Sequence, residues 1–267
     1  MDSTRNGFEQ ILFAVSDGVA TLTLNRPAQF NALTLTMARE LHLAAIECDE
    51  DPSIRAVVVT GAGKAFFAGG DLASFAEAGD DRGRLIKELT TYFHAAISRF
   101  NRMDAPVLAA ANGVAAGAGF SFLLSVDLAV AARSAKFTMA YTKAGLTPDG
   151  SSSYFLPRIV GLRRAQELTL TNRTLSAADA LEWGIVNEVV EDSETLTRTL
   201  ALASQLAGGP TRSLGDAKRL MREGTDESLE SQMEREAQCI AASALRRDGR
   251  EGVAAFMEKR TPIFHGE

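Results

Sequence analysis

The feature that most constrains the fold is an alternation of strand-like and helix-like segments along the first 200 residues. Residues 13–27 predict two short strands, because alternating and β-branched residues flank an Asp-Gly turn. Apolar residues at helical spacing follow at 34–51, then a buried strand in "SIRAVVVTGAG" (53–63), then an amphipathic helix at 83–101. This alternation is typical of an α/β fold.

The strand pattern stops near residue 200, and we therefore expect two parts, an α/β domain at 1–200 and a helical region at 201–267. The polar patch "GDDRGR" (79–84) predicts a mobile loop, and Ser176 with Asp179 predicts a capped helix start. The helical region carries apolar residues in helical register, namely Leu220, Met221, Leu229, Met233, Ile240 and Leu245. So much apolar surface predicts burial against the main domain or against another chain.

Composition excludes several classes of protein. With 46% hydrophobic and 23% charged residues the chain can bury a substantial core, and its net charge of −6 argues against a nucleic-acid partner. No apolar run approaches the roughly 20 residues that span a bilayer. The start "MDSTRNGFEQ" has no apolar signal segment, which predicts a cytoplasmic protein. Two cysteines and three scattered histidines predict no metal site.

Two segments share a design in which an apolar strand runs into a turn of glycine and alanine and then a helix start. They are "FFAGGDL" (66–72) and "AAGAGFS" (115–121). Small residues let another molecule approach the backbone, and free N–H groups at a helix start favour negative charge. If the turns face each other, one N–H from each could hold one oxyanion. Tight helix–strand packing also requires Gly and Ala, so each turn alone is weak evidence for function. Phosphate-loop and dinucleotide fingerprints are absent, so we expect no separate cofactor.

A single carboxylate stands in "LTPDGSSSY" (146–154), where Pro148 and Gly150 flank Asp149. One interpretation is a turn, because an Asp side chain in Pro-Asp-Gly can bond to its own backbone. The other is that Asp149 is the acid/base of an active site. The stretch alone leaves both open.

Six motifs, in order, resemble the enoyl-CoA hydratase/isomerase (crotonase) family over about residues 10–264: "LNRPAQFNAL", "GAGKAFFAGGDL", "PVLAAANGVAAGAG", "LTPDGSSSYFLPRIVG", "LSAADALEWGIVNEVV" and "EGVAAFMEKRTPIF". The resemblance implies a spiral of ββα units and a C-terminal helical region that builds homotrimers, often paired into hexamers. It also implies an acyl-CoA thioester substrate from fatty acid or aromatic acid metabolism, with coenzyme A as part of that substrate. The enolate of the thioester would lie in an oxyanion hole.

Carried over by position, the resemblance implies that the N–H groups of Ala68 and Ala118 are the oxyanion donors. It implies that Tyr141 contacts substrate, and that coenzyme A contacts come from Arg26, Ala28, Phe30, Ala65, Asp71, Leu72, Phe256 and Lys259, the last two reaching a neighbouring subunit. Arg26 and Lys259 could instead be solvated cations, and Phe256 a core residue.

The chain departs from the hydratases of this family, which use two glutamates. Ser121 and Tyr141 stand at those positions, and neither is a carboxylate base. The pattern "GLTPDGSSS" resembles epoxyphenylacetyl-CoA isomerases and 3-enoyl/2-enoyl-CoA isomerases, in which this Asp is the acid/base. We therefore expect an isomerase with Asp149 as its proton carrier.

Three alternatives stay open. The first is an enoyl-CoA hydratase with a non-standard acid/base set. The second is an aroyl-CoA dehalogenase, which would use Asp149 as nucleophile and His94 as base, although His94 lies off its helix's apolar stripe and fits a structural or surface role. The third is a catalytically silent CoA-binding protein that kept the fold.

Overall fold

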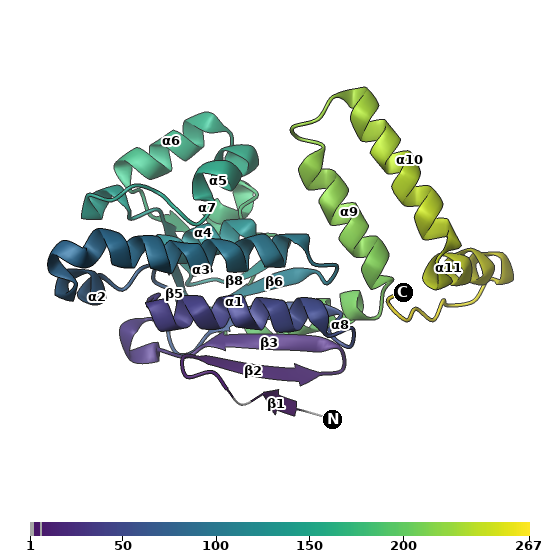
Figure 1. Cartoon of the computed structure of the whole chain (residues 1–267), viewed down its shortest axis with the longest axis horizontal. Coiled ribbons are helices and arrows are strands. Elements are labelled where there is room, and N and C mark those ends of the chain that lie inside the picture. The colour runs from purple at the N-terminus through teal and green to yellow at the C-terminus, as the bar shows by residue number, and fades with distance from the viewer. Residues whose placement is uncertain (1–2, 6) are drawn as a thin grey trace.

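Two β-sheets form the centre of the protein, as a computed structural model that describes residues 3–5 and 7–267 shows (Figure 1). The larger sheet has seven strands in the order β1 (Ser3–Arg5), β2 (Ile11–Ser16), β3 (Val19–Leu24), β4 (Ala56–Gly61), β6 (Val107–Ala111), β8 (Leu128–Ala132) and β11 (Glu188–Val190). The smaller has the order β10 (Leu175–Ser176), β9 (Lys136–Thr138), β7 (Val114–Ala116) and β5 (Ala65–Phe67). From β3 to β11 the large sheet is parallel, and β1 and β2 pair antiparallel at its edge.

A ββα unit repeats along the chain. β4, β6 and β8 are neighbours in the large sheet, and each is followed at once by β5, β7 or β9, which are neighbours in the small sheet. A helix completes each unit, first α2 (Leu72–Glu77) with α3 (Arg82–Arg102), then α4 (Ala118–Ser125), then α5 (Ser152–Val160). The predicted α/β spiral of ββα units is confirmed.

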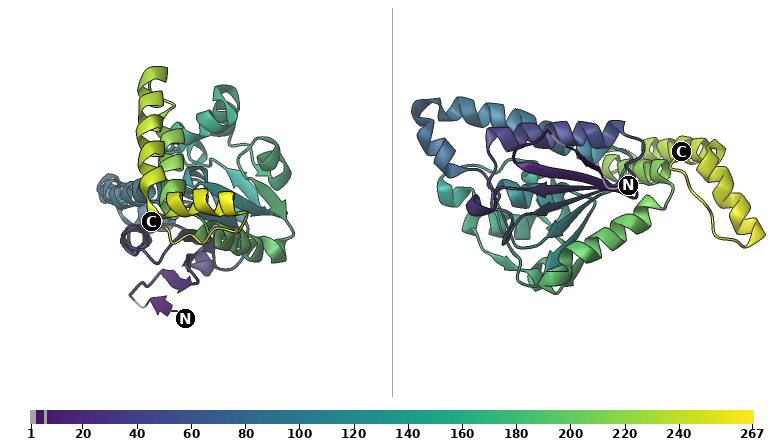
Figure 2. Two further views of the ribbon diagram at one scale, coloured as in Figure 1. Left: turned by 90° about the vertical axis from the view of Figure 1, so that its right-hand side faces the viewer. Right: turned by 90° about the horizontal axis from the view of Figure 1, so that it is seen from below.

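Helices cover both faces of the large sheet (Figure 2). Val57 and Val59 of β4 belong to the main core, which also holds residues of α1 (Leu35–Glu50) and α3. Val58 packs in a second cluster with Ala203 and Ala207 of α8 (Thr195–Ala207). Burial on both faces explains why the strand at 56–61 is a continuous run of small and β-branched residues.

The peripheral helices test two local predictions. α7 (Ala177–Glu182) follows α6 (Leu162–Thr171) and begins with the predicted cap, in which Ser176 and Asp179 bond reciprocally. The prediction of a mobile loop at 79–84 is wrong, because Gly79–Asp81 form the short 3-10 helix η2 and α3 starts at Arg82. Acidic side chains are stabilising in the first turn of a helix, and Asp80 and Asp81 occupy the first turn of η2. Other single turns are η1 (Pro27–Gln29), η3 (Thr142–Ala144) and η4 (Asp192–Glu194).

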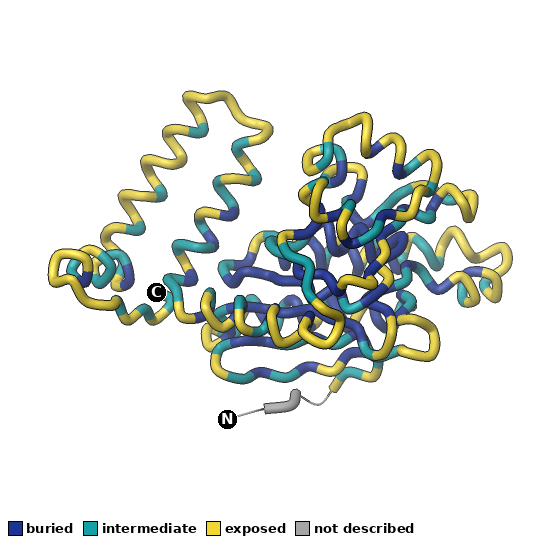
Figure 3. Tube along the Cα trace, turned by 180° about the vertical axis from the view of Figure 1, so that it is seen from behind, coloured by how far each residue is buried: buried dark blue, intermediate teal, exposed yellow. Residues whose placement is uncertain are grey.

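The C-terminal helices α9 (Thr211–Glu223), α10 (Leu229–Leu245) and α11 (Arg247–Glu258) confirm the predicted helical region. The expected boundary after residue 200 is misplaced, because it cuts through α8, which packs on the large sheet. α10 has no buried residue and α11 has two, so both stand out as exposed in Figure 3. No helix in the described part of the chain is long and apolar enough to cross a membrane.

Candidate active site

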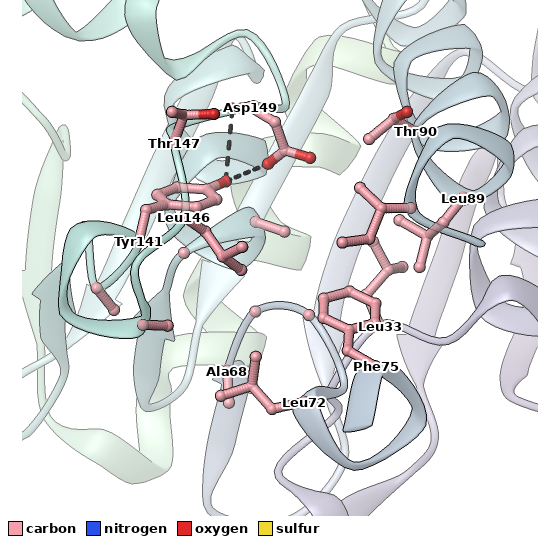
Figure 4. A pocket seen from close by; sticks show the side chains of 17 residues that line it. Leu33, Ala68, Leu72, Phe75, Leu89, Thr90, Tyr141, Leu146, Thr147 and Asp149 are labelled. Atoms are coloured by element: carbon pink, nitrogen blue, oxygen red, sulfur yellow. Dashed lines mark hydrogen bonds between the residues drawn. The ribbon is translucent and has the colours of Figure 1, made fainter. Parts of the chain in front are cut away.

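A cavity of about 330 Å³ lies between α2, the first half of α3, the turns that follow β5 and β7, and the loop that precedes α5 (Figure 4). Its wall is mainly apolar and includes Leu33, Leu72, Phe75, Ile86, Leu89 and Leu146. The side chains of Thr90, Tyr141, Thr147 and Asp149 add polar atoms. Of the described residues that line this cavity, Asp149 alone carries a charged side chain.

The two glycine turns touch each other at the floor of this cavity. A Cβ added to Gly69 would lie 2.8 Å from the carbonyl oxygen of Ala116, and one added to Gly119 would lie 1.9 Å from that of Phe67. Gly69 also has φ +98, a conformation that L side chains rarely adopt. Close packing therefore brings the two turns face to face, and an oxyanion hole between them stays a prediction.

The prediction of Ala68 as an oxyanion donor disagrees with the structure. The Ala68 N–H donates to the carbonyl of Phe30 at 3.1 Å, so it is already engaged. Two residues further on, Gly70 forms a parallel bridge with Leu33, in which the N–H groups of Leu33 and Asp71 make the bonds. The N–H of Gly70 consequently points away from Leu33, and no described residue accepts from it. Gly70 lines the cavity, and its N–H is the available donor of this turn.

Ala118 meets the requirement that Ala68 does not. It is the first residue of α4, so its N–H has no carbonyl four residues earlier within the helix. The Gly117 N–H donates to the Thr138 carbonyl, and the Ser121 N–H donates to the Gly117 carbonyl. No described group accepts from the N–H of Ala118. Ala118 and Gly70 therefore each present one free donor to the same cavity.

Arg26 and Asp71 hold the first glycine turn (66–72) in place. The Arg26 guanidinium pairs with the Asp71 carboxylate at 2.8 Å and also donates to the Ala32 carbonyl at 2.5 Å. The same carboxylate caps α2 by accepting from the N–H groups of Ala73 and Ser74. These two predicted coenzyme A contacts thus bind each other, and any contact with a ligand stays a prediction.

Asn31 supports the segment that leads into this turn, and the sequence interpretation missed it. Its buried side chain donates to the carbonyls of Ala62 and Ala65 at 3.0 and 2.8 Å and accepts from the Arg26 N–H at 2.9 Å. Its φ of +59 suits Asn, which tolerates the left-handed region better than most residues. The only sequence signal was the quoted motif "LNRPAQFNAL", which contains it.

Asp149 lies across the cavity from the two turns, in the loop before α5 (Figure 4). One carboxylate oxygen accepts a short hydrogen bond from the hydroxyl of Tyr141. Gly150 has φ +58, and a Cβ there would lie 2.7 Å from the Phe93 ring and 2.9 Å from Cβ of Ser121. The Pro-Asp-Gly segment is therefore a turn pressed against the core, with its carboxylate in the cavity.

Tyr141 and Ser121 stand together beside that carboxylate. The Tyr141 hydroxyl lies 2.8 Å from Ser121 Oγ, and both side chains are buried. Burial, reinforced by the neighbouring Asp149 charge, raises the pKa of Tyr141 far above its usual range. Tyr141 is thus a neutral hydrogen-bond donor to Asp149 throughout the physiological pH range.

His94 lies behind the loop and not in the cavity wall. The Gly150 N–H donates to its Nε2 at 3.1 Å, and the residue is otherwise exposed on α3. As bonded, Nε2 supports the backbone next to Asp149, which agrees with the structural role expected for His94.

The other predicted binding residues divide into two groups. Phe30, Ala28 and Leu72 are exposed near the first turn, while Ala65 is buried in β5. Phe256 and Lys259 lie at the C-terminal end of α11, at the opposite end of the molecule from α2 (Figure 1). Within one chain these two do not reach the cavity. No group of His, Cys, Asp or Glu among the described residues could hold a metal ion.

The spiral of ββα units and the cavity with two facing backbone donors define the class of protein. A model of the enoyl-CoA hydratase/isomerase family matches residues 14–267. The chain is 38% identical over 263 residues to "1,2-epoxyphenylacetyl-CoA isomerase" of Escherichia coli, covering 97% of this chain and 99% of that protein. It is 41% identical over 247 residues to "4-chlorobenzoyl coenzyme A dehalogenase-2" of an Arthrobacter species, covering 91% and 89%.

A solved structure, that of an enoyl-CoA hydratase from Polaromonas, matches with a TM-score of 0.91 at 33% identity, over 95% of this chain and 99% of that chain. The protein belongs to the enoyl-CoA hydratase/isomerase family, whose members act on coenzyme A thioesters.

Proposed function

We propose that the protein is an acyl-CoA isomerase that moves a proton, and with it a double bond, next to the thioester. The observation that carries this proposal is the single carboxylate of the cavity, Asp149, opposite two free backbone donors. One carboxylate suits isomerisation, because the group that removes a proton at one carbon can return it at another.

The mechanism needs only groups of this cavity. Asp149 accepts a proton from the carbon next to the thioester carbonyl, and the electron pair left behind moves onto the carbonyl oxygen. The N–H groups of Gly70 and Ala118 stabilise that oxyanion, and one such donor is typically worth about 3 kcal/mol. Asp149 then returns the proton further along the acyl chain as the carbonyl re-forms.

The cavity wall favours an uncharged acyl group. The wall is mainly aliphatic and aromatic, and no Lys or Arg belongs to the described residues that line it. A carboxylate on the acyl chain would lose its hydration there without gaining a cation. Fatty or aromatic acyl groups therefore fit better than dicarboxylic ones.

Hydration is less well supported because it needs a second group to activate water. Ser121 and Tyr141 hold the two positions at which the hydratases carry glutamates. Tyr141 is kept neutral by burial, and its hydroxyl proton is directed at Asp149. Neither residue can act as a carboxylate base.

Dehalogenation is the second candidate, favoured by the identity of 41% to a 4-chlorobenzoyl coenzyme A dehalogenase. It would require Asp149 to attack the aromatic ring and His94 to activate water. His94 Nε2 accepts from the Gly150 N–H, so this nitrogen is not free as bonded here. We therefore rank it below isomerisation.

Replacing Asp149 with Asn tests the proposal. Asn keeps nearly the same shape but cannot accept the proton, so turnover of trans-3-hexenoyl-CoA should fall roughly a hundred to ten-thousandfold, the range for a general base. The control is Asp17→Asn, because Asp17 also precedes a glycine in a turn but lies exposed between β2 and β3. Equal activity of the two variants would remove Asp149 from the chemistry.

Isotopes separate the candidates. In deuterium oxide an isomerase should place deuterium on the acyl chain whenever the proton held by Asp149 exchanges with solvent before its return. Turnover of 4-chlorobenzoyl-CoA in ¹⁸O-water should label Asp149 only if it is a nucleophile. Labelled Asp149 would overturn the isomerase proposal. A wild-type protein that binds acyl-CoA but turns over neither thioester would be a silent CoA-binding protein.

We also propose a homotrimer or a hexamer. On α10 and α11 seven large apolar side chains are at least half exposed, namely Leu229, Met233, Ile240, Leu245, Val253, Phe256 and Met257. Such a surface needs a partner, and a neighbouring copy would also bring Phe256 and Lys259 near another chain's cavity. Light scattering at micromolar concentration checks this, and a monomer of 28.5 kDa would contradict it.

A further inference from the structure

A chain of polar groups connects Asp149 with the peptide unit that supplies an oxyanion donor. The Asp149 carboxylate bonds to the Tyr141 hydroxyl, which lies 2.8 Å from Ser121 Oγ. Ser121 Oγ in turn lies 3.1 Å from the carbonyl oxygen of Gly117. That carbonyl and the free N–H of Ala118 belong to one peptide unit.

The hydroxyl protons of this chain cannot satisfy every contact at once. A carboxylate only accepts, so an ionised Asp149 takes the one proton of the Tyr141 hydroxyl. Ser121 also has one proton and two acceptors within reach, the Tyr141 oxygen and the Gly117 carbonyl. Because Ser121 is fully buried, bonding inside the protein decides between them.

The negative charge changes place during the proposed reaction. Before proton transfer it lies on Asp149, and a Ser121 proton directed at Tyr141 strengthens the Tyr141 bond to that charge, since bonds in series polarise one another. After transfer the charge lies on the enolate oxygen at the Ala118 N–H. A Ser121 proton directed at the Gly117 carbonyl then polarises that peptide unit and makes its N–H a better donor.

We propose that the Ser121 hydroxyl switches between Tyr141 and the Gly117 carbonyl, so that it stabilises the negative charge first on Asp149 and then in the oxyanion hole. Ser121 is in this sense a positioning residue that acts through Tyr141 and through the Gly117–Ala118 peptide. The inference rests on the proposed isomerase function, because it needs a charge that moves from Asp149 to an enolate.

The test compares Ser121→Ala with Ser125→Ala. Ser125 is one turn further along α4, equally buried, and bonds to the Phe122 carbonyl at 2.7 Å, but no described group links it to Asp149. With trans-3-hexenoyl-CoA, Ser121→Ala should lower kcat about tenfold, the scale of one buried hydrogen bond, with KM little changed. Ser125→Ala should leave kcat within about twofold.

Two further readouts distinguish switching from packing. In Ser121→Ala the acidic limb of the kcat/KM profile should move to higher pH, because the ionised carboxylate loses support. Tyr141→Phe removes the hydrogen bond to Asp149 and so interrupts the series of polar groups. Adding Ser121→Ala to the Tyr141→Phe variant should therefore lower kcat by clearly less than tenfold. Each of three results would overturn the proposal. They are fully additive losses of kcat in the double variant, an unmoved pH profile of kcat/KM, and equal losses of kcat in Ser121→Ala and Ser125→Ala.

Failure of the proposed function gives a different result. If Asp149→Asn is fully active, or the wild type does not isomerise the thioester, the isomerase proposal fails whatever Ser121 does. If Asp149→Asn is inactive while Ser121→Ala matches Ser125→Ala, only the switch fails.

Discussion

Replacing Gly119 with Ala tests whether contact between the two glycine turns creates the site. Gly119 lies in the first turn of α4, and a Cβ there would lie 1.9 Å from the Phe67 carbonyl oxygen and 2.7 Å from the Phe67 Cβ. Real Cβ atoms essentially never come closer than 3.0 Å, so α4 and β5 must separate by about 1 Å. This movement pulls Ala118 away from Gly70.

The energies can be worked out from that geometry. Without a clash, Ala in place of Gly in a helix should stabilise by about 0.5–1 kcal/mol. Overpacking of a tight contact costs about 1–3 kcal/mol, so we expect a net loss of about 1–2 kcal/mol in the free energy of unfolding. Misplacing a catalytic group by 1 Å can cost about a hundredfold in rate, so kcat should fall by about that factor.

Gly161→Ala is the matched control. Gly161 has φ +80 and ψ 157, and nothing lies within 4 Å of an added Cβ, so only backbone strain of about 1–3 kcal/mol is expected. Urea unfolding at equal protein concentration should therefore give similar losses for the two variants, while steady-state kinetics should show a low kcat in Gly119→Ala alone. A Gly119→Ala variant with wild-type kcat would refute the account of the turns.

Three further predictions concern residues that support the site and the C-terminal helical region. Asn31→Ala leaves the carbonyls of Ala62 and Ala65, just before the first glycine turn, without their donor and should cost at least about 2 kcal/mol in urea unfolding. Lys218→Met removes a buried ammonium that bonds to Asp127 at 3.0 Å, and about 2–4 kcal/mol of stability should be lost in the same assay. Hydrogen bonds from Arg260 lower the pKa of Glu251 to about 2. This contact therefore stabilises the C-terminal helical region at pH values above the ordinary Glu pKa near 4.3, and its stabilisation is lost as pH falls toward 2. NMR titration of this carboxyl should give the low midpoint, and Arg260→Gln should raise it toward the ordinary value, with the Ile263 N–H still lowering the pKa of Glu251.

Local patterns predicted most of the fold because each ββα unit is built from neighbours in sequence. Continuous apolar runs gave the buried strands, and helical spacing gave α1 and α3. The domain boundary at 200 was misplaced for a physical reason. α8 is helical like the tail, but Ala203 and Ala207 pack on the large sheet, and no local signal distinguishes the two environments.

The choice between Ala68 and Gly70 could not be made from the sequence. Both are small residues in one turn, and which N–H stays free depends on Phe30 and Leu33, more than thirty residues earlier. The role of Arg26 was hidden in the same way, since its carboxylate partner Asp71 is 45 positions away. Long-range pairing decides which polar groups of a local motif are left for a ligand.

Asp149 reaches the cavity through one packing arrangement. Gly150 lies so close to Ser121 that a Cβ on residue 150 would be 2.9 Å from the Ser121 Cβ. A glutamate at position 121 would need the space that the Tyr141 hydroxyl and this loop now fill. With Ser121 in place, residue 150 must be glycine for the loop to bring Asp149 into the cavity. The Ser121 hydroxyl lies within reach of Tyr141, so a series of hydrogen bonds supports the Asp149 carboxylate from behind the cavity wall.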